Sequence, residues 1–183
     1  MSNIQTRQKD DFYPTPPEAT KALLDVERFD SAVWEPAAGD GAIAKVLAEN
    51  GYGVVASDLN DYGYCKPGTD FLMETKLPEI HTPVTSLITN PPYRLAEQFI
   101  QHAIQLGVTK HAWLLRLSFL EGVKRRTTLF EPHPPSKVHI FSSRLTIWRG
   151  DEARAGNGTT AYAWFVWEKR VGSLKFQPRI NWL

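Results

Sequence analysis

The fold is decided by one stretch of the sequence, Ser31-Ala32-Val33-Trp34-Glu35-Pro36-Ala37-Ala38-Gly39-Asp40-Gly41-Ala42-Ile43-Ala44-Lys45-Val46-Leu47-Ala48. Its apolar start predicts a strand, its end has the spacing of a helix, and a turn of small residues joins them. Glycine and other small residues let a backbone come close to a ligand and let the helix pack tightly on the strand. The turn departs from the dinucleotide fingerprint G-x-G-x-x-G, because only Gly39 and Gly41 are glycine and Glu35 leads it. The stretch therefore predicts a strand–turn–helix unit of an α/β sheet, with a ligand site at its turn.

A second strand is predicted at residues 52–57, and Asp58 ends it. An acidic residue that closes the second strand, about 20 residues after the glycine turn, is placed to bind ribose hydroxyls. Leu59, beside it, is placed to line the face of an adenine ring. We therefore expect both residues to face the same ligand as the glycine turn.

The apolar run 84–89 predicts a short buried strand that ends at Asn90-Pro91-Pro92-Tyr93. Two consecutive prolines prevent both the continuation of the strand and an immediate helical turn. A polar amide, a rigid kink and an aromatic ring therefore stand at the carboxyl end of a strand. In open α/β sheets, that edge is where ligands bind.

The remaining elements alternate in the same way. Thr15 is the expected cap of the first helix. Helices are predicted at 18–24 and 95–104, and further strands at 111–117, 137–141 and 161–167. No helix separates the last two strands, so we expect a hairpin that makes an antiparallel edge. The order predicts a doubly wound α/β fold in a single domain over residues 1–183, of which the polar residues 1–11 are expected to be mobile.

Four ordered motifs resemble those of the class I S-adenosylmethionine (SAM)-dependent amino-methyltransferases, which methylate exocyclic NH2 groups. They are Tyr13-Pro-Thr-Pro, Glu35-Pro-Ala-Ala-Gly-Asp-Gly, Asp58 and Asn90-Pro-Pro-Tyr. The resemblance covers the span from about Asp11 to Trp167, and the chain looks most like the small adenine-specific DNA methyltransferases of phages and prophages. It implies a Rossmann-like, mostly parallel seven-stranded sheet with an antiparallel C-terminal hairpin. Unlike larger members of the family, the chain has no segment long enough for a separate target-recognition domain.

The resemblance also implies two sets of site residues. The cofactor SAM would contact Tyr13, Thr15, Glu35, Pro36, Ala37, Gly39, Gly41, Asp58, Leu59, Asp70, Phe71 and Asn90. Catalysis would rest on Asn90, Pro91, Pro92 and Tyr93. An adenine amino nitrogen is a poor nucleophile, because its lone pair is delocalised into the ring. The Asn90 side-chain oxygen and a proline carbonyl would accept its N–H protons as it attacks the methyl group, while Tyr93 stacks on the base.

Charge is distributed unevenly along the chain. Residues 1–110 hold nine Lys and Arg against fifteen Asp and Glu, and residues 111–183 hold twelve against five. This asymmetry favours a polyanion-facing surface in the second half and hence a nucleic acid, though not DNA over RNA. The resemblance makes DNA the expected partner. The loop 148–160 is long for a hairpin connection, and such loops are often functional. The expected nucleic-acid contacts are Lys124, Arg125, Arg126, Arg144, Trp148, Arg149 and Arg154.

Several classes of protein do not fit the sequence. Cys65 is the one cysteine, which excludes an intramolecular disulfide, and no Pro-Cys dipeptide exists for a cytosine-C5 methyltransferase. The histidines show no metal-ligand spacing, so no metal is expected. No long apolar run and no signal-peptide pattern are present, so we expect a cytoplasmic protein of a bacterium or a phage-infected cell, with no membrane partner.

Three readings of the function stay open. The first is transfer of a methyl group from SAM to N6 of adenine in DNA, on a flipped or single-stranded base. The second is methyl transfer to RNA, to protein glutamine or to cytosine N4, although the cytosine-N4 enzymes more often have Ser in place of Asn. The third is a SAM- or DNA-binding protein without turnover, against which the intact Asn90 motif counts. The oligomeric state and any recognition sequence do not follow from the sequence.

Overall fold

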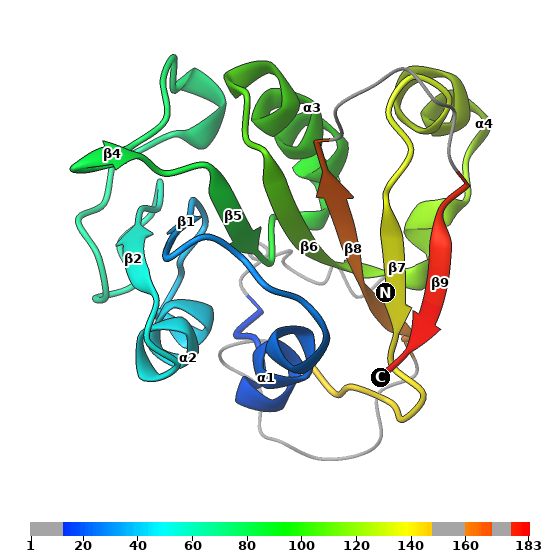
Figure 1. Ribbon diagram of the computed structural model, residues 1–183, viewed down its shortest axis with the longest axis horizontal. Coiled ribbons are helices and arrows are strands. Elements are labelled where there is room, and N and C mark those ends of the chain that lie inside the picture. Colours follow the sequence, from blue (N-terminus) through cyan, green and yellow to red (C-terminus); the bar gives the residue numbers. More distant parts are fainter. Residues whose placement is uncertain (1–12, 148–159, 170–176) are drawn as a thin grey trace, which may run out of the picture.

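The computed structural model describes residues 13–147, 160–169 and 177–183, shown in Figure 1. The helices are α1 (Pro17–Val26), α2 (Ala42–Glu49), α3 (Ala96–Leu106) and the short α4 (Val123–Arg125). Single turns of 3-10 or π helix are η1 (Phe71–Met73), η2 (Tyr93–Leu95), η3 (Leu117–Leu120) and η4 (Arg126–Phe130). The main strands are β1 (Ala32–Glu35), β2 (Gly53–Ala56), β5 (Ser86–Thr89), β6 (Lys110–Arg116), β7 (Lys137–Ile140), β8 (Tyr162–Glu168) and β9 (Arg179–Trp182). A separate hairpin pairs β3 (Glu79–Ile80) with β4 (Thr82–Pro83).

The main sheet has seven strands in the order β2-β1-β5-β6-β8-β7-β9. β2, β1, β5 and β6 pair in parallel, and so do β7 and β9, whereas β8 runs antiparallel to both β6 and β7. This confirms the predicted doubly wound, mostly parallel α/β fold with a C-terminal hairpin. The predicted edge was wrong, because β8 lies inside the sheet and β9 forms the edge beyond β7. β9 was not predicted, since all four of its residues are exposed and its pattern is short.

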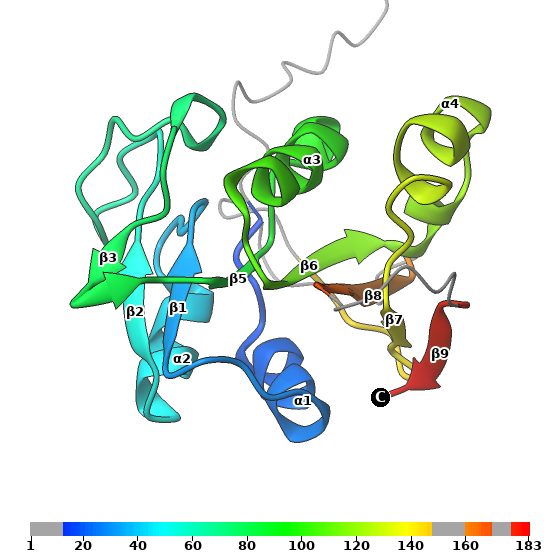
Figure 2. The same cartoon turned by 45° about the horizontal axis from the view of Figure 1, so that its top comes forward.

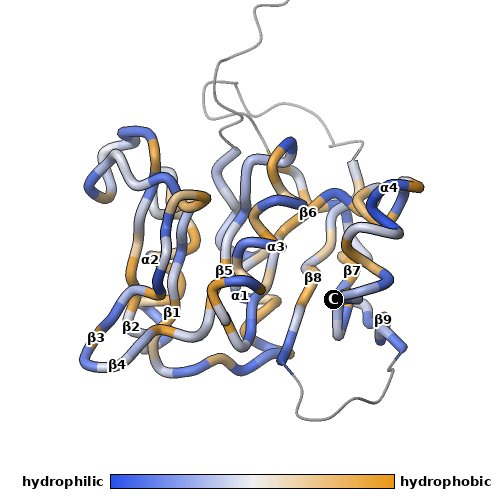
Figure 3. Tube along the Cα trace, turned by 90° about the horizontal axis from the view of Figure 1, so that it is seen from above, coloured by the Kyte–Doolittle hydropathy of each residue, from blue (hydrophilic) through white to orange (hydrophobic). Residues whose placement is uncertain are grey.

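Helices cover both faces of the sheet. Figure 2 shows α1 and α2 on one side and α3 with α4 on the other. The central strands are buried on both faces, so neighbouring residues of one strand enter different cores. In β8, for example, Trp164 packs in the core beneath α1 and α2, and Phe165 packs in the core beneath α3. Figure 3 shows the same pattern along the chain, with apolar segments in the central strands and hydrophilic ones in the outer loops.

Thr15 does not cap α1, contrary to the sequence prediction. Pro16 occupies the N-cap position and no side chain caps the helix there, while Pro17 begins it. A proline in the first turn suits a helix, because its missing N–H has no intrahelical partner there anyway. Thr15 instead lies buried at the carboxyl edge of the sheet, where it meets Asn90.

One buried carboxylate joins the first helix to the far half of the sheet. Glu27, at the C-terminal end of α1, is 2% exposed and accepts hydrogen bonds of 2.8 Å from Lys110, Lys137 and His139. Burial raises the pKa of Glu27, but these hydrogen bonds outweigh burial and lower it to about 2. Because the folded pKa lies below the ordinary value of 4.5, the carboxylate contributes stability that is present above pH 4.5 and is lost as the pH falls toward 2.

Replacing Glu27 by Gln tests this connection. The change removes the buried anion that the two lysines share, which is expected to reduce the free energy of unfolding by about 3 kcal/mol at pH 7. Urea unfolding measures the loss, and the variant should also lack part of the decline in stability that the wild type shows below pH 4.5. Glu168→Gln is the matched control, because Glu168 contacts the same lysines from an exposed position and should cost under about 1 kcal/mol. Equal losses in the two variants would contradict the assignment.

Candidate functional site

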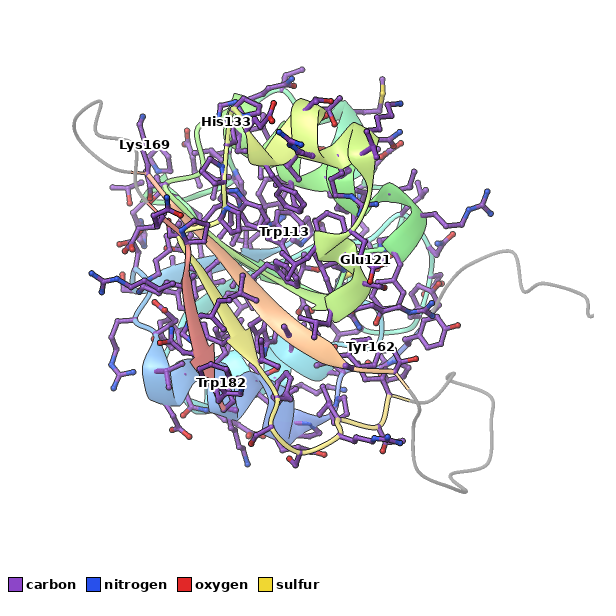
Figure 4. The ribbon with its side chains drawn as sticks, turned by 90° about the vertical axis from the view of Figure 1, so that its right-hand side faces the viewer. Trp113, Glu121, His133, Tyr162, Lys169 and Trp182 are labelled. Carbon is purple, nitrogen blue, oxygen red and sulfur yellow. The ribbon has the colours of Figure 1, made fainter. Side chains whose placement is uncertain are left out.

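A cavity of about 880 Å³ opens at the carboxyl ends of β1, β2, β5 and β6. The parallel strands bring their following loops to one edge of the sheet, which is why residues far apart in sequence meet there. Tyr162 begins β8 and Lys169 follows it, and they lie at opposite ends of that strand in Figure 4, so the reversed strand brings its first residue to this edge. The predicted residues that line the cavity are Tyr13, Thr15, Glu35, Pro36, Ala37, Gly39, Asp58, Leu59, Asp70, Phe71, Asn90, Pro92 and Tyr93.

Two predicted residues, Gly41 and Pro91, do not line the cavity. Gly41 begins α2 with a φ of +79°, a left-handed conformation that glycine adopts without strain. A Cβ atom there would lie 2.4 Å from the Tyr64 ring. Gly41 therefore serves the start of the helix and the packing of Tyr64.

Asp58 holds the glycine turn in place. Its Oδ2 accepts a hydrogen bond of 2.9 Å from the Gly39 N–H, and its Oδ1 accepts one of 2.8 Å from the Asn60 N–H. The carboxylate is buried at the end of β2, and each oxygen keeps acceptor capacity for a ligand. Its first role in the structure is thus to shape the backbone that lines the cavity.

Glu35 is a buried carboxyl group in the cavity wall. It is 1% exposed, and its Oε2 has no hydrogen-bond partner among the described residues. Burial raises its pKa well above the ordinary value, and the nearby Asp40 and Asp58 carboxylates raise it further. A cation placed beside this group would supply the missing partner and favour its ionised form.

The Asn90 side chain is fixed by the N-terminal segment. Its Nδ2 donates to the Tyr13 carbonyl at 2.9 Å and to the Thr15 Oγ1 at 3.1 Å. A carbonyl oxygen can only accept, so the amide nitrogen must face Tyr13. The amide oxygen, Oδ1, is then left buried without a hydrogen-bond partner among the described residues.

The rest of the tetrapeptide is only partly available to a ligand. The Pro92 carbonyl accepts a hydrogen bond of 2.8 Å from the Leu95 N–H and keeps a second lone pair as an acceptor. The Tyr93 ring lies 5.7 Å from the Tyr13 ring between centroids. The guanidinium of Arg116 stands 5.0 Å over it. One face of Tyr93 is thus already covered, and burial raises the pKa of its hydroxyl well above the usual range.

Asp70 and Phe71 also line the cavity. Asp70 Oδ1 accepts a hydrogen bond of 3.0 Å from the Leu72 N–H and so caps η1. Phe71 is 2% exposed and packs between Trp34 and Phe99, at centroid distances of 5.0 and 4.8 Å. Both residues therefore stabilise the wall as well as facing the cavity.

The expected nucleic-acid contacts do not form one set of free cations. Arg125 donates to the Phe119 and Glu121 carbonyls, and Arg126 pairs with Glu131 at 2.8 Å. Lys124 and Arg144 are exposed. Trp148, Arg149 and Arg154 lie outside the described residues.

Two arginines that the sequence reasoning missed do line the cavity, Arg94 and Arg116. The position of each arginine in the sequence could have indicated this. Arg94 directly follows the tetrapeptide, and Arg116 is the last residue of β6, at the same edge of the sheet.

In the residues that the structure describes, no group of three or more His, Cys, Asp or Glu side chains is arranged to hold a metal ion. In the same residues, no helix has the length and hydropathy needed to cross a membrane.

The comparisons with known proteins identify the fold. No protein-family model and no curated protein matches the sequence. Among solved structures, a putative RNA methyltransferase from Pyrococcus horikoshii matches with a TM-score of 0.63 and 15% identity, over 93% of this chain and 94% of that chain. A SAM-dependent O-methyltransferase from Thermotoga maritima matches with a TM-score of 0.53 and 15% identity, over 93% of this chain and 71% of that chain.

A third solved structure is longer than this chain. The methyltransferase subunit of a type I restriction-modification system from Streptococcus thermophilus matches with a TM-score of 0.57 and 16% identity. The match covers 91% of this chain and 46% of that chain, so the chain spans about half the length of that subunit. The similarity shows that this chain has the Rossmann-like α/β fold of these methyltransferases.

Replacing Asp58 by Asn tests the structural role of its carboxylate. The amide keeps one acceptor oxygen, so either the Gly39 or the Asn60 N–H loses its acceptor, and the free energy of unfolding is expected to fall by about 1–3 kcal/mol. Denaturant unfolding measures this loss. Asp61→Asn is the control, because Asp61 is exposed and accepts a single backbone hydrogen bond that the amide oxygen retains. A change at Asp58 no larger than that at Asp61 would contradict this role.

Proposed function

We propose that the protein transfers a methyl group from SAM to an exocyclic amine, and that its substrate is N6 of adenine in DNA. The observation that carries the proposal is the Oδ1 of Asn90, a residue that lines the cavity. This oxygen is buried and has no hydrogen-bond partner among the described residues. A buried acceptor without a partner is costly, so a donor from a ligand is expected to supply the missing hydrogen bond. An exocyclic amine is such a donor.

The cavity residues fit SAM as the methyl donor. The cofactor carries a sulfonium, an ammonium and an adenosine, and when bound it supplies an activated methyl group. Glu35, with its unpartnered Oε2, would hold the ammonium. Asp58 would bind the ribose hydroxyls with its remaining acceptor capacity. Asp70, Phe71 and Leu59 would receive the adenine, since they line the same cavity.

Asn90 and the proline carbonyl would act on the target amine. As the nitrogen lone pair forms the new N–C bond, the bond between the methyl carbon and sulfur breaks, and a proton then leaves the nitrogen to solvent. Positive charge grows on the nitrogen during this attack. The Asn90 oxygen and a carbonyl of the proline pair would stabilise that charge by accepting N–H hydrogen bonds, and the Asn90 side chain is held in place before the substrate arrives.

The choice of adenine in DNA rests on the resemblance of the motifs to those of adenine-specific DNA methyltransferases. The charge of the second half of the chain favours a nucleic acid without separating DNA from RNA. A base that is paired in a duplex cannot reach an amide buried at a strand end, so the target base must be flipped out or single-stranded. The restriction-modification subunit among the similar structures fits DNA, whereas the putative RNA methyltransferase among them fits RNA. Incubation with labelled SAM and matched DNA, RNA and protein substrates separates these possibilities, and DNA is expected to take the label.

Replacing Asn90 by Ala tests the catalytic assignment. The change removes the acceptor that stabilises charge in the transition state, so kcat is expected to fall by about 100-fold or more. SAM affinity, measured by calorimetry, should change little, because the interaction is made only as the amine gains charge. Asn60→Ala removes an amide from the same cavity outside the tetrapeptide and should leave kcat near the wild-type value. Near-normal turnover of the Asn90 variant would show that the tetrapeptide is structural.

Proton release tests the role of Glu35. Burial raises its pKa, so the free carboxyl group tends to be protonated, and a bound ammonium favours the ionised form. SAM binding is therefore expected to release protons, which calorimetry in buffers of different ionisation enthalpy detects. Glu35→Gln should remove this release and weaken binding. A Glu35→Gln variant that binds SAM as tightly as the wild type would exclude Glu35 as the ammonium partner.

A further inference from the structure

Two arginines reach the cavity beside the proposed catalytic oxygen. Arg94 lies in η2, immediately after the tetrapeptide, and Arg116 ends β6. β5 and β6 are adjacent parallel strands, so the residues that follow them meet at one edge of the sheet. Both arginines line the cavity and are exposed to solvent.

Neither guanidinium is committed to a protein acceptor. Within the described part of the chain, neither Arg94 nor Arg116 forms a hydrogen bond or an ion pair, and Arg116 makes only a cation–π contact, with the Tyr93 ring. Arg125 differs in this respect, since its Nη1 donates to two backbone carbonyls and its guanidinium forms an ion pair with Glu97 at 3.7 Å. An unpaired guanidinium retains all five N–H donors for an anion.

The cavity is also divided by charge. Glu35, Asp40, Asp58 and Asp70 line it, and none of them forms an ion pair with a lysine or arginine of the described residues. These carboxylates follow β1 and β2 or lie near them, whereas the two arginines follow β5 and β6. Carboxylates suit a cationic cofactor and arginines suit an anionic substrate, so the two ends differ in the charge of the ligand that they favour.

We propose that Arg94 and Arg116 form a binding subsite for the phosphodiester groups that flank the target nucleotide. The proposal rests on the function proposed above and specifies its substrate as a nucleic-acid strand. In a nucleotide whose amine reaches Asn90, the base and the sugar separate that amine from the phosphates, so the phosphates lie toward the open side of the cavity. The exposed Arg94 and Arg116 side chains line the same cavity and are placed to meet them there. Guanidinium groups bind phosphate oxygens through paired hydrogen bonds, which a lysine cannot reproduce. This subsite, and not the 124–126 segment, positions the strand for transfer.

The test is binding of a fluorescent single-stranded, adenine-containing oligodeoxynucleotide at several salt concentrations, measured by anisotropy. The variants are Arg94→Gln, Arg116→Gln, the double variant and Arg116→Lys. Each lost phosphate contact should make the slope of log K against log salt shallower by about 0.7 for a single strand. Arg116→Lys keeps the charge, so it should keep the slope while losing affinity. Arg179→Gln, an exposed arginine that does not line the cavity, is the matched control for loss of one positive charge.

Two measurements separate binding from structure. SAM affinity and thermal unfolding should stay at wild-type values in Arg94→Gln and Arg116→Gln. If Arg116→Gln instead lowers SAM affinity or unfolds the protein while the salt slope stays unchanged, Arg116 only supports Tyr93 and the subsite is wrong. A double variant with the slope of Arg179→Gln, or a wild type that binds no oligonucleotide, also overturns the proposal.

Methylation of the same oligonucleotide, measured beside its binding, separates this subsite from the proposed reaction. Arginine-dependent binding without methylation would support the subsite and contradict the proposed reaction. Methylation together with an unchanged salt slope of binding in the double variant would support the reaction and contradict the subsite. A matched oligoribonucleotide forms a second arm. Arginine-dependent binding of RNA alone would support the phosphodiester subsite and assign it to RNA.

Discussion

The hydrogen bond from the Asn90 Nδ2 to the Tyr13 carbonyl is the constraint on which the site depends. It joins the end of β5 to a segment 77 residues earlier in the chain and fixes which side of the amide faces the cavity. With the nitrogen committed to Tyr13 and Thr15, the oxygen must point away from both. The orientation is therefore set by the fold before any substrate binds, which is the condition for electrostatic catalysis without reorganisation.

The fold supplies the rest of the site through strand direction. Four parallel strands end at one edge, and each delivers a polar side chain there, from Glu35 on β1 to Arg116 on β6. The carboxylates follow β1 and β2 or lie near them, and the arginines follow β5 and β6. The cavity therefore has two parts of opposite charge. That division matches a reaction between a cationic donor and a nucleic-acid strand, as proposed above.

Local pattern was enough to predict much of this architecture. The strands around β1, β5 and β6, the helices that follow them and the edge where Asn90 lies are all encoded by short apolar runs and the residues that end them. What depends on distant partners was not predictable. Thr15 was expected to cap a helix from its local sequence. Its hydrogen bond to Asn90, 75 residues away, could not be foreseen from that sequence. Gly41 was assigned to the cofactor site because it belongs to the glycine turn. The Tyr64 ring that lies against it is distant in sequence, so this contact was not predicted.

The same limit applies to the charged residues. A run such as 124–126 shows the number of cations but not their acceptors, and Arg125 and Arg126 turned out to be paired within the protein. The position of β8 inside the sheet and the addition of β9 depend on pairing across long sequence separations, which period-2 patterns do not encode.

The most direct test of the central claim is the chemical identity of the product. An adenine-containing oligodeoxynucleotide, incubated with the protein and SAM, is digested to nucleosides and analysed by mass spectrometry against standards. The account predicts N6-methyldeoxyadenosine in the wild-type digest and its absence from the Asn90→Ala digest. A methyl group on a ring carbon or on another base, or an equal yield from the Asn90 variant, would contradict it.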